Sequence, residues 1–291
     1  MKPPPFEYHR AFSAQEAVAT LAELGEDAKI LAGGQSLTPM MNFRLARPSA
    51  LVDINNVAEL DYVRRDGDVL RVGALTRHRT IELATGPDIT DGFAVLPKAA
   101  RWIGHYPIRT RGTIGGSIAH ADPSAEWCLL ARMFDAVIVV LGPDGSREIP
   151  AAEWFQGFLS TVCALDELVT EIVFPRPRRH AALTEFAQRQ GDFGIAAAAV
   201  ALEVTDGVCS DVSVVLGGVS GEPFRIPEIE EALAGEPATA STWASAGRMA
   251  AELATPSSDA HGSAAYRKHL VGTLTARAFG EAVTSAQSQL A

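Results

Sequence analysis

Two short loops, each containing a Gly-Gly pair, hold the residues of this chain best suited to chemistry. The first loop is Ala32-Gly33-Gly34-Gln35-Ser36, and the second, about 80 residues later, is Thr113-Ile114-Gly115-Gly116-Ser117. Because glycine has no Cβ atom, consecutive backbone N–H groups can point into one concavity, where an anion is held. The hydroxyl groups of Ser36, Thr113 and Ser117 would add donors. Together the loops predict a site that grips a diphosphate from two sides.

Each loop taken alone has a simpler interpretation, because a Gly-Gly pair is usually a tight turn. Neither loop has the G-x-G-x-x-G spacing followed by a helix that a Rossmann dinucleotide site requires. The chain also lacks the G-x-x-x-x-G-K-[ST] pattern of a P-loop. From the residues alone, a phosphate-binding pair of loops and two ordinary turns both stay open.

The cysteines exclude a metal cluster carried by this chain. Cys128, Cys163 and Cys209 stand far apart, without a C-x-x-C pair and without the spacing of a zinc or iron–sulfur site. We expect reduced thiols in a cytoplasmic protein and no bound metal. If the chain does redox chemistry, its electron carrier is therefore an organic cofactor.

Composition narrows the classes of partner. The chain has 291 residues, with 25 Lys+Arg against 35 Asp+Glu, so its net charge is −10. An acidic protein is poorly suited to bind nucleic acid or an anionic membrane surface, since both attract cations. The apolar stretch 195–204 is too short to cross a bilayer. We expect a globular protein with no membrane span and no nucleic-acid partner.

The pattern before the first loop and just after it predicts a small α/β unit over about residues 1–55. Ser13 begins a helix that runs to about Leu24, where Gly25 ends it. The other predicted elements of this unit are a strand at 29–32, which leads into the first loop, a helix at 38–44 and a strand at 50–54.

The second loop lies in a longer unit, residues 56–177, with mixed elements. Its predicted elements are a strand at 68–73, helices at 80–84, 93–103 and 123–134, and a hairpin of strands 136–141 and 146–149. The segment Pro175-Arg176-Pro177-Arg178-Arg179 is the predicted linker. Beyond it, strands at 183–189, 196–205 and 212–216, a short extended piece at 225–226 and mostly helix from residue 228 predict an α+β domain, residues 178–291.

These segments resemble one known family over essentially the whole chain. The run from Lys29 to Leu37, with Phe43-Arg44-Leu45 and Leu51-Val52-Asp53-Ile54 after it, is similar to the FAD-binding subunit of molybdenum hydroxylases, such as aerobic carbon monoxide dehydrogenase and xanthine dehydrogenase. Further matching segments are 108–126, Arg189-Gln190-Gly191-Asp192-Phe193, 216–219 and 262–267. The resemblance implies a vanillyl-alcohol-oxidase-like α+β fold, with two α/β subdomains in a FAD-binding domain (1–177) and a C-terminal α+β domain (178–291).

The resemblance also implies roles for individual residues. FAD would lie between the first two subdomains, with its diphosphate against the loops Ala32–Ser36 and Thr113–Ser117. Glu126 matches a position near the ribityl hydroxyls, and an exposed charge on a helix is its simpler interpretation. Asp192 and Phe193 match a turn that approaches the isoalloxazine, although Phe193 also fits an ordinary core aromatic. His120 and Asp122 are read as loop structure, so no catalytic residue is expected.

The function implied by the resemblance is electron transfer by one subunit of an oxidoreductase. A large partner would carry the molybdenum cofactor, and a small partner would pass electrons from two [2Fe–2S] clusters to FAD on this chain, in a dimer of heterotrimers. The acceptor would be quinone or another molecule. The expected location is cytoplasmic, with peripheral membrane association through the assembled complex as an option.

Two other functions stay open at this point. One is a stand-alone FAD-dependent oxidase or dehydrogenase, which would turn over substrate without partners; the lack of an evident catalytic base counts against it. The other is a flavin-free nucleotide-binding assembly module. The substrate that the whole complex oxidises is not specified by this chain, since it would bind to the molybdenum subunit.

Overall fold

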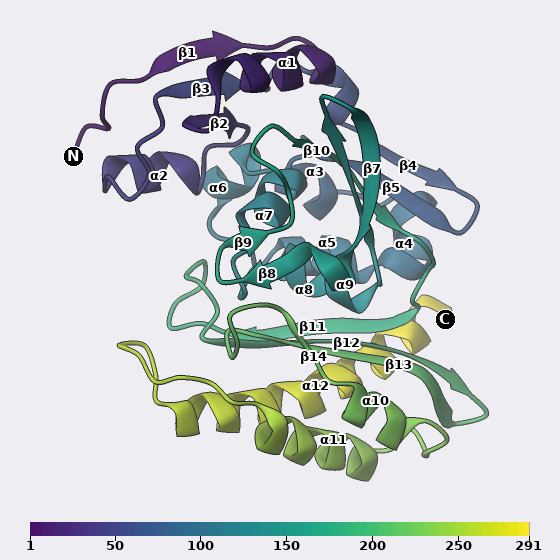
Figure 1. Cartoon of the computed structure of the whole chain (residues 1–291). Coiled ribbons are helices and arrows are strands. Elements are labelled where there is room, and N and C mark those ends of the chain that lie inside the picture. Colours follow the sequence, from purple (N-terminus) through teal and green to yellow (C-terminus); the bar gives the residue numbers. More distant parts are fainter. Residues whose placement is uncertain (291) are drawn as a thin grey trace.

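The chain folds into three layers, which lie one below another in Figure 1. The structure is a computed structural model that describes residues 1–290, with side chains described as far as residue 285. Among the residues described, no helix combines the length and the apolar character that crossing a membrane requires.

The top layer is a parallel three-stranded sheet in the order β1-β3-β2, flanked by two helices (Figure 1). Its elements are β1 (Glu7–Arg10), α1 (Ala14–Leu24), β2 (Ala28–Leu31), α2 (Leu37–Asn42) and β3 (Ala50–Asp53). The Ser13 side chain accepts a hydrogen bond from the Glu16 N–H at the start of α1, and Gly25 ends the helix at φ 78°. The predicted helices and strands of this unit are confirmed, while β1 was not predicted.

The middle layer is an antiparallel five-stranded sheet in the order β4-β5-β10-β6-β7. Its strands are β4 (Val63–Asp66), β5 (Val69–Gly73), β6 (Val137–Gly142), β7 (Gly145–Pro150) and β10 (Leu168–Phe174). The 142–145 hairpin turn between β6 and β7 is confirmed. The central strand β10 was not predicted, because its nearly continuous apolar run has no alternation to identify it.

Helices and two short strands surround this sheet. They are a 3₁₀ helix (Ala58–Leu60), α3 (His78–Glu82), α4 (Pro87–Phe93), α5 (Val95–Ala100), α6 (Tyr106–Arg111), α7 (Ile114–His120), α8 (Glu126–Met133), α9 (Ala151–Trp154), β8 (Phe155–Gly157) and β9 (Ser160–Thr161). The prediction of one helix over 93–103 is wrong. The chain bends at Asp91 and Gly92, where φ of Gly92 is 83°, and α5 then ends at Ala100.

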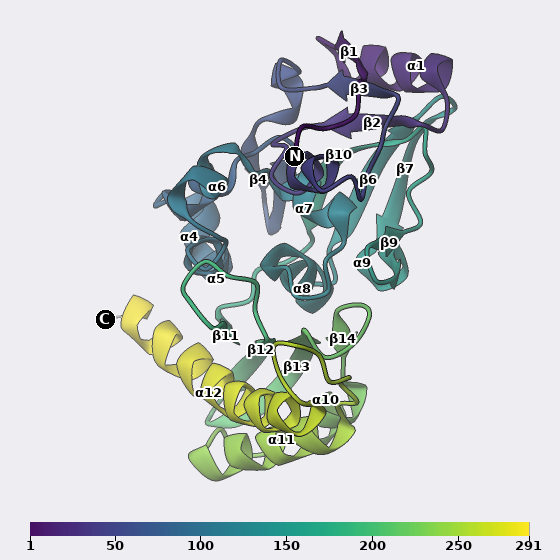
Figure 2. The ribbon, with the colours of Figure 1, turned by 90° about the vertical axis from the view of Figure 1, so that its left-hand side faces the viewer.

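The bottom layer is a four-stranded antiparallel sheet, and three helices cover its outer face (Figure 2). Its elements are β11 (His180–Phe186), β12 (Ala196–Thr205), β13 (Val208–Gly217), β14 (Phe224–Arg225), α10 (Pro227–Leu233), α11 (Ala240–Leu253) and α12 (Ala264–Leu290). The predicted strands 196–205 and 212–216 are confirmed, and β13 begins earlier than expected.

Strand β12 contributes to two hydrophobic cores. Ala197, Ala199 and Ala201 pack into the core of the middle layer, whereas Ala198 and Val200 pack against the C-terminal helices. Alternate residues of a strand point to opposite faces, so one strand can serve both cores. The small alanine side chains allow helices to approach this strand closely from either side.

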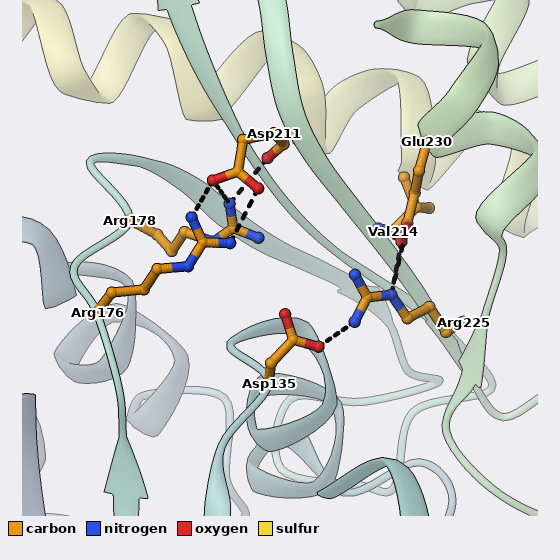
Figure 3. A network of polar contacts seen from close by, with 7 residues as sticks. All are labelled: Asp135, Arg176, Arg178, Asp211, Val214, Arg225 and Glu230. Atoms are coloured by element: carbon orange, nitrogen blue, oxygen red, sulfur yellow. Dashed lines mark hydrogen bonds and ion pairs between the residues drawn. The ribbon is translucent and has the colours of Figure 1, made fainter. Parts of the chain in front are cut away.

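Ion pairs fasten the bottom layer to the middle one, as Figure 3 shows. Arg178 follows β10, and its Nη1 atom lies 2.6 Å from Asp211 Oδ2 on β13. Arg176 also donates to the Asp211 carboxylate. On the other side, Arg225 joins Asp135, just after α8, to Glu230 of α10. The hydrogen bond from Arg176 and the charge of Arg178 hold the pKa of Asp211 below its usual range.

Candidate functional site

The first glycine loop presents unpaired backbone donors. It follows β2 directly and leads into α2, and Gly34 has a φ of 70°. Among the residues that the structure describes, the backbone N–H groups of Gly33, Gly34, Gln35 and Ser36 donate to no protein acceptor. The side-chain amide of Gln35 donates through Nε2 to the Gly33 carbonyl, at 2.9 Å, which braces the loop from within. Successive free N–H groups in a turn are the usual cradle for a phosphate oxygen.

The second glycine loop forms the first turn of α7, and its amides are already occupied. Gly115 N–H donates to the Ala74 carbonyl at 2.9 Å, Ile114 N–H to the Thr76 carbonyl at 3.1 Å, and Gly116 N–H to Thr113 Oγ1 at 3.0 Å. A Cβ atom on Gly115 would lie 2.5 Å from the Ala74 Cβ atom. This loop is therefore anchored on the end of β5. Within the described residues, the Ser117 hydroxyl is the polar side-chain group of this loop that has no hydrogen-bond partner in the protein.

The first loop touches the backbone directly before the second loop. A Cβ atom built on Gly33 would lie 2.3 Å from the Arg111 carbonyl oxygen and 2.7 Å from the Gly112 Cα atom, so the backbones are in direct contact. This approach brings the free amides of the first loop next to the start of α7. The sequence prediction that both loops form one site depends on this contact.

Two side chains that sequence reasoning missed connect the loops. Asn55 donates to the Ala32 carbonyl at 2.8 Å and accepts from Arg77 Nη2 at 2.7 Å. Arg77 in turn donates to the Arg111 carbonyl. A signal for Asn55 existed, because it directly follows the predicted strand 50–54, but Arg77 lies in an unpatterned segment before α3.

Glu126 lies at the first position of α8, the helix that packs on β13 of the bottom layer. Glu185 lies on β11 and pairs with Ala197 of β12, which in turn pairs with Gly217 of β13. Gly217 lies against Leu129 of α8. The charge of Glu126 acts on Glu185, so the two carboxyl groups lie near each other. Glu185 is 7% exposed, and its Oε2 atom has no hydrogen-bond partner. Burial and the Glu126 charge raise the pKa of Glu185 to about 9, and burial raises the pKa of Glu126 to about 7.

We expect Glu185→Gln to stabilise the protein at pH 8 and to change its stability little at pH 5. In the unfolded chain this glutamate releases its proton near pH 4.5, but in the folded protein it keeps the proton until about pH 9. Between pH 4.5 and about pH 9, rising pH therefore lowers the stability of the folded protein, and glutamine, which does not titrate, removes this loss of stability. A gain of roughly 2 kcal/mol, or several degrees in Tm, is expected at pH 8.

Thermal unfolding of both proteins at the two pH values measures this effect. Glu252→Gln, at an exposed position on α11, is the matched control and should give no pH-dependent gain. An equal change in Tm at pH 5 and pH 8 for Glu185→Gln would show that the carboxyl group carries no extra proton.

The turn with Asp192 and Phe193 comes from the bottom layer and contacts the middle one. Gly191, at φ 88°, lies so close to His105 that a Cβ atom there would be 2.5 Å from the imidazole. His105 precedes α6, which leads into the second loop. The Phe193 ring is 73% exposed, and Asp192 is also exposed. The ring is therefore not part of the core of this chain and is free to stack on another planar group.

His120 and Asp122 have structural surroundings. His120 is the last residue of α7, not a loop residue, and burial lowers its pKa. Asp122 Oδ1 accepts hydrogen bonds from the Ser124 N–H and hydroxyl groups, at 2.9 and 2.7 Å. In the described part of the chain, no group of three His, Cys, Asp or Glu residues is arranged to hold a metal, and the three cysteines are free thiols.

Two family models cover the chain in sequence order. The model described as "FAD binding domain in molybdopterin dehydrogenase" matches residues 4–177. The model described as "CO dehydrogenase flavoprotein C-terminal domain" matches residues 181–282. Both of the predicted resemblances, in the first and in the second half of the chain, are thereby confirmed.

Relatives of this chain and solved structures that resemble it match over nearly the full length of both chains. The chain is 38% identical to the alpha subunit of the 6-hydroxypseudooxynicotine dehydrogenase complex of Paenarthrobacter nicotinovorans, covering 99% of this chain and 97% of that protein. The structure superposes with a TM-score of 0.93 on carbon monoxide dehydrogenase from Hydrogenophaga pseudoflava, at 35% identity over 98% of this chain and 99% of that one. For quinoline 2-oxidoreductase from Pseudomonas putida 86 the TM-score is 0.92, at 34% identity with both chains fully covered.

Proposed function

The chain belongs to the FAD-binding medium subunits of the molybdenum hydroxylases, and from this we propose that it carries electrons from a partner's iron–sulfur clusters to an external acceptor. It is an oxidoreductase subunit, and its cofactor is FAD. Bound FAD supplies the redox chemistry, because the isoalloxazine takes up and releases one or two electrons. The residues of this chain contribute binding, orientation and electrostatics.

The first loop fits the diphosphate of FAD, and this single observation carries the assignment. Four successive N–H groups, from Gly33 to Ser36, have no acceptor within the described protein, and Gly33 touches the backbone directly before the second loop. No aspartate or glutamate stands inside either loop, so an anion meets no like charge there. Neutral amide dipoles bind a diphosphate well when they converge on it.

The second loop takes a supporting part in this proposal. Its amides at 114–117 hold β5 and the start of α7, so we propose that Gly115 and Gly116 place the loop and that Thr113 and Ser117 offer their hydroxyl groups. Glu126 would accept hydrogen bonds from ribityl hydroxyls. Asp192 and the exposed ring of Phe193 would approach the isoalloxazine, where the ring excludes water from one edge.

The partners we propose are a large subunit with the molybdenum cofactor and a small subunit with two [2Fe–2S] clusters, arranged as a dimer of heterotrimers. The medium-chain names of relatives support this, since they are components of larger enzymes. The acceptor we propose is quinone or another external molecule. The location we propose is the cytoplasm, which the three free thiols support.

We also propose that the chain divides after residue 177 into a FAD-binding domain (1–177, with subdomains of about 1–55 and 56–177) and a C-terminal domain (178–291). Among the strands described, no sheet combines strands from both sides of this point, and the two family models meet between residues 177 and 181. Both observations support the division.

The test is reconstitution of the purified chain with FAD. We expect one FAD per chain after incubation and desalting, measured by the visible flavin absorption, and no turnover of candidate substrates by the isolated chain. Co-purification with its partners should add molybdenum and iron in proportion to flavin. A chain that takes up no flavin would overturn the proposal, and substrate turnover without partners would favour a stand-alone dehydrogenase.

A further inference from the structure

Arg77 stands at the junction of the two glycine loops. Its Nη1 group donates to the Arg111 carbonyl, which is the same oxygen that leaves no room for a Cβ atom on Gly33. Its Nη2 group donates to Asn55 Oδ1 at 2.7 Å, and Asn55 holds the Ala32 carbonyl at 2.8 Å. The backbone of Arg77 also forms an isolated bridge with Thr113. One guanidinium therefore connects the first residue of one loop with the backbone just before the other.

The Arg77 side chain has no carboxylate partner within the described residues. Twelve ion pairs occur there, and none includes Arg77. Both of its side-chain acceptors are neutral oxygens. The side chain is half-buried. Burial and the nearby Arg111 lower its pKa more than the charges of Asp61 and Asp53, which form no ion pair with it, raise it, but an arginine stays protonated in proteins. A partly buried cation that contacts no carboxylate directly is incompletely compensated, which marks a place where an external anion is favourable.

We propose that Arg77 is a positioning residue for the FAD diphosphate: its fork holds the two glycine loops together, and its unpaired charge attracts the phosphates to them. The proposal rests on the FAD site described above. Arg77 acts through Asn55, Arg111 and the field it produces at the loops. The residue thus supplies the positive charge that neither loop contains.

Two substitutions separate the two parts of this role. Arg77→Gln removes the charge, whereas Arg77→Lys keeps the charge but loses the fork that reaches two oxygens at once. We expect Arg77→Gln to weaken FAD binding at least about tenfold and to reduce its dependence on salt. Arg77→Lys should weaken FAD binding as well, but with the salt dependence of the wild type.

Equilibrium titration of the full chain with FAD, ADP and riboflavin, at low and high salt, measures these effects. Riboflavin has no phosphate, so its affinity should be nearly the same in the wild type and Arg77→Gln, while FAD and ADP lose affinity together. A general loss of structure would reduce all three equally. Arg248→Gln, an exposed arginine on α11, is the matched control and should bind all three ligands as the wild type does.

The outcomes separate this proposal from the function itself. Wild-type chain that binds no FAD would overturn the proposed function. Wild-type binding of FAD with unchanged FAD affinity in Arg77→Gln, or with equal losses for FAD and riboflavin, would overturn the role of Arg77 alone. If Arg77→Gln does not fold, Arg77→Lys decides: wild-type FAD affinity in this variant would refute the connection between the loops.

Discussion

Gly33→Ala is expected to reduce FAD affinity by roughly 30- to 100-fold, which corresponds to about 2–3 kcal/mol. The added Cβ atom would lie 2.3 Å from the Arg111 carbonyl oxygen and 2.7 Å from the Gly112 Cα atom. Both are backbone atoms and cannot turn aside as a flexible side chain would. The loops must therefore move apart, which takes the free amides of 33–36 away from the second loop. FAD titration of the purified variant measures the loss.

Gly280→Ala is the matched control for this substitution. Gly280 lies inside α12, and a Cβ atom there would meet nothing within 4 Å. Because alanine favours a helix over glycine, this variant should keep wild-type FAD affinity and gain up to about 1 kcal/mol of stability. If Gly33→Ala bound FAD as tightly as the wild type, the contact between the loops would have no part in binding.

Asp211→Asn is expected to destabilise the protein by about 3–5 kcal/mol and to lower Tm by roughly 10 °C. The Arg178 side chain is 1% exposed, and its ion pair is with this carboxylate, so the substitution leaves a buried cation unpaired. Asn tolerates the left-handed conformation at this position, where φ is 47°. The effect therefore reports the lost charge and not a strained backbone. Thermal unfolding with and without FAD measures it.

Arg176→Ala separates the buried pair from the exposed one. The Arg176 side chain is 46% exposed, and its removal leaves the pair of Arg178 and Asp211 in place. An exposed ion pair contributes little, so a loss below about 1 kcal/mol is expected. Equal losses for Arg176→Ala and Asp211→Asn would show that burial of Arg178 does not determine the contact between the layers.

Local signals in the sequence predicted those elements that begin or end at a recognisable capping or turn residue. The helix after Ser13 and the 142–145 hairpin were found from a cap and a turn that need no partner in space. Strand β10 was missed because it is buried between β5 and β6, and only that pairing distinguishes its apolar run from a helix. At the bend, Gly92 lies so close to Pro177, far away in the chain, that no Cβ atom would fit there.

Only those parts of the candidate site that local sequence patterns identify were predicted. The glycine pairs are visible in the sequence, and so is the family pattern around Glu126 and Asp192. Whether an amide is free depends on tertiary contacts, such as those of Gly115 with Ala74, which no local pattern contains. Arg77 and Glu185 were missed because what distinguishes each of them is an absent tertiary contact. Arg77 has no carboxylate in contact with it, and Glu185 Oε2 has no hydrogen-bond donor.

The alanines of β12 have a consequence for how the protein unfolds. Ala197 and Ala199 complete the core of the middle layer, while Ala198 completes the core under the C-terminal helices. Loss of the bottom sheet would expose apolar surface of both layers to water at once. We therefore expect the two parts to melt cooperatively, in a single calorimetric transition. A chain cut after residue 177 would aggregate instead of persisting as a separate flavin-binding unit.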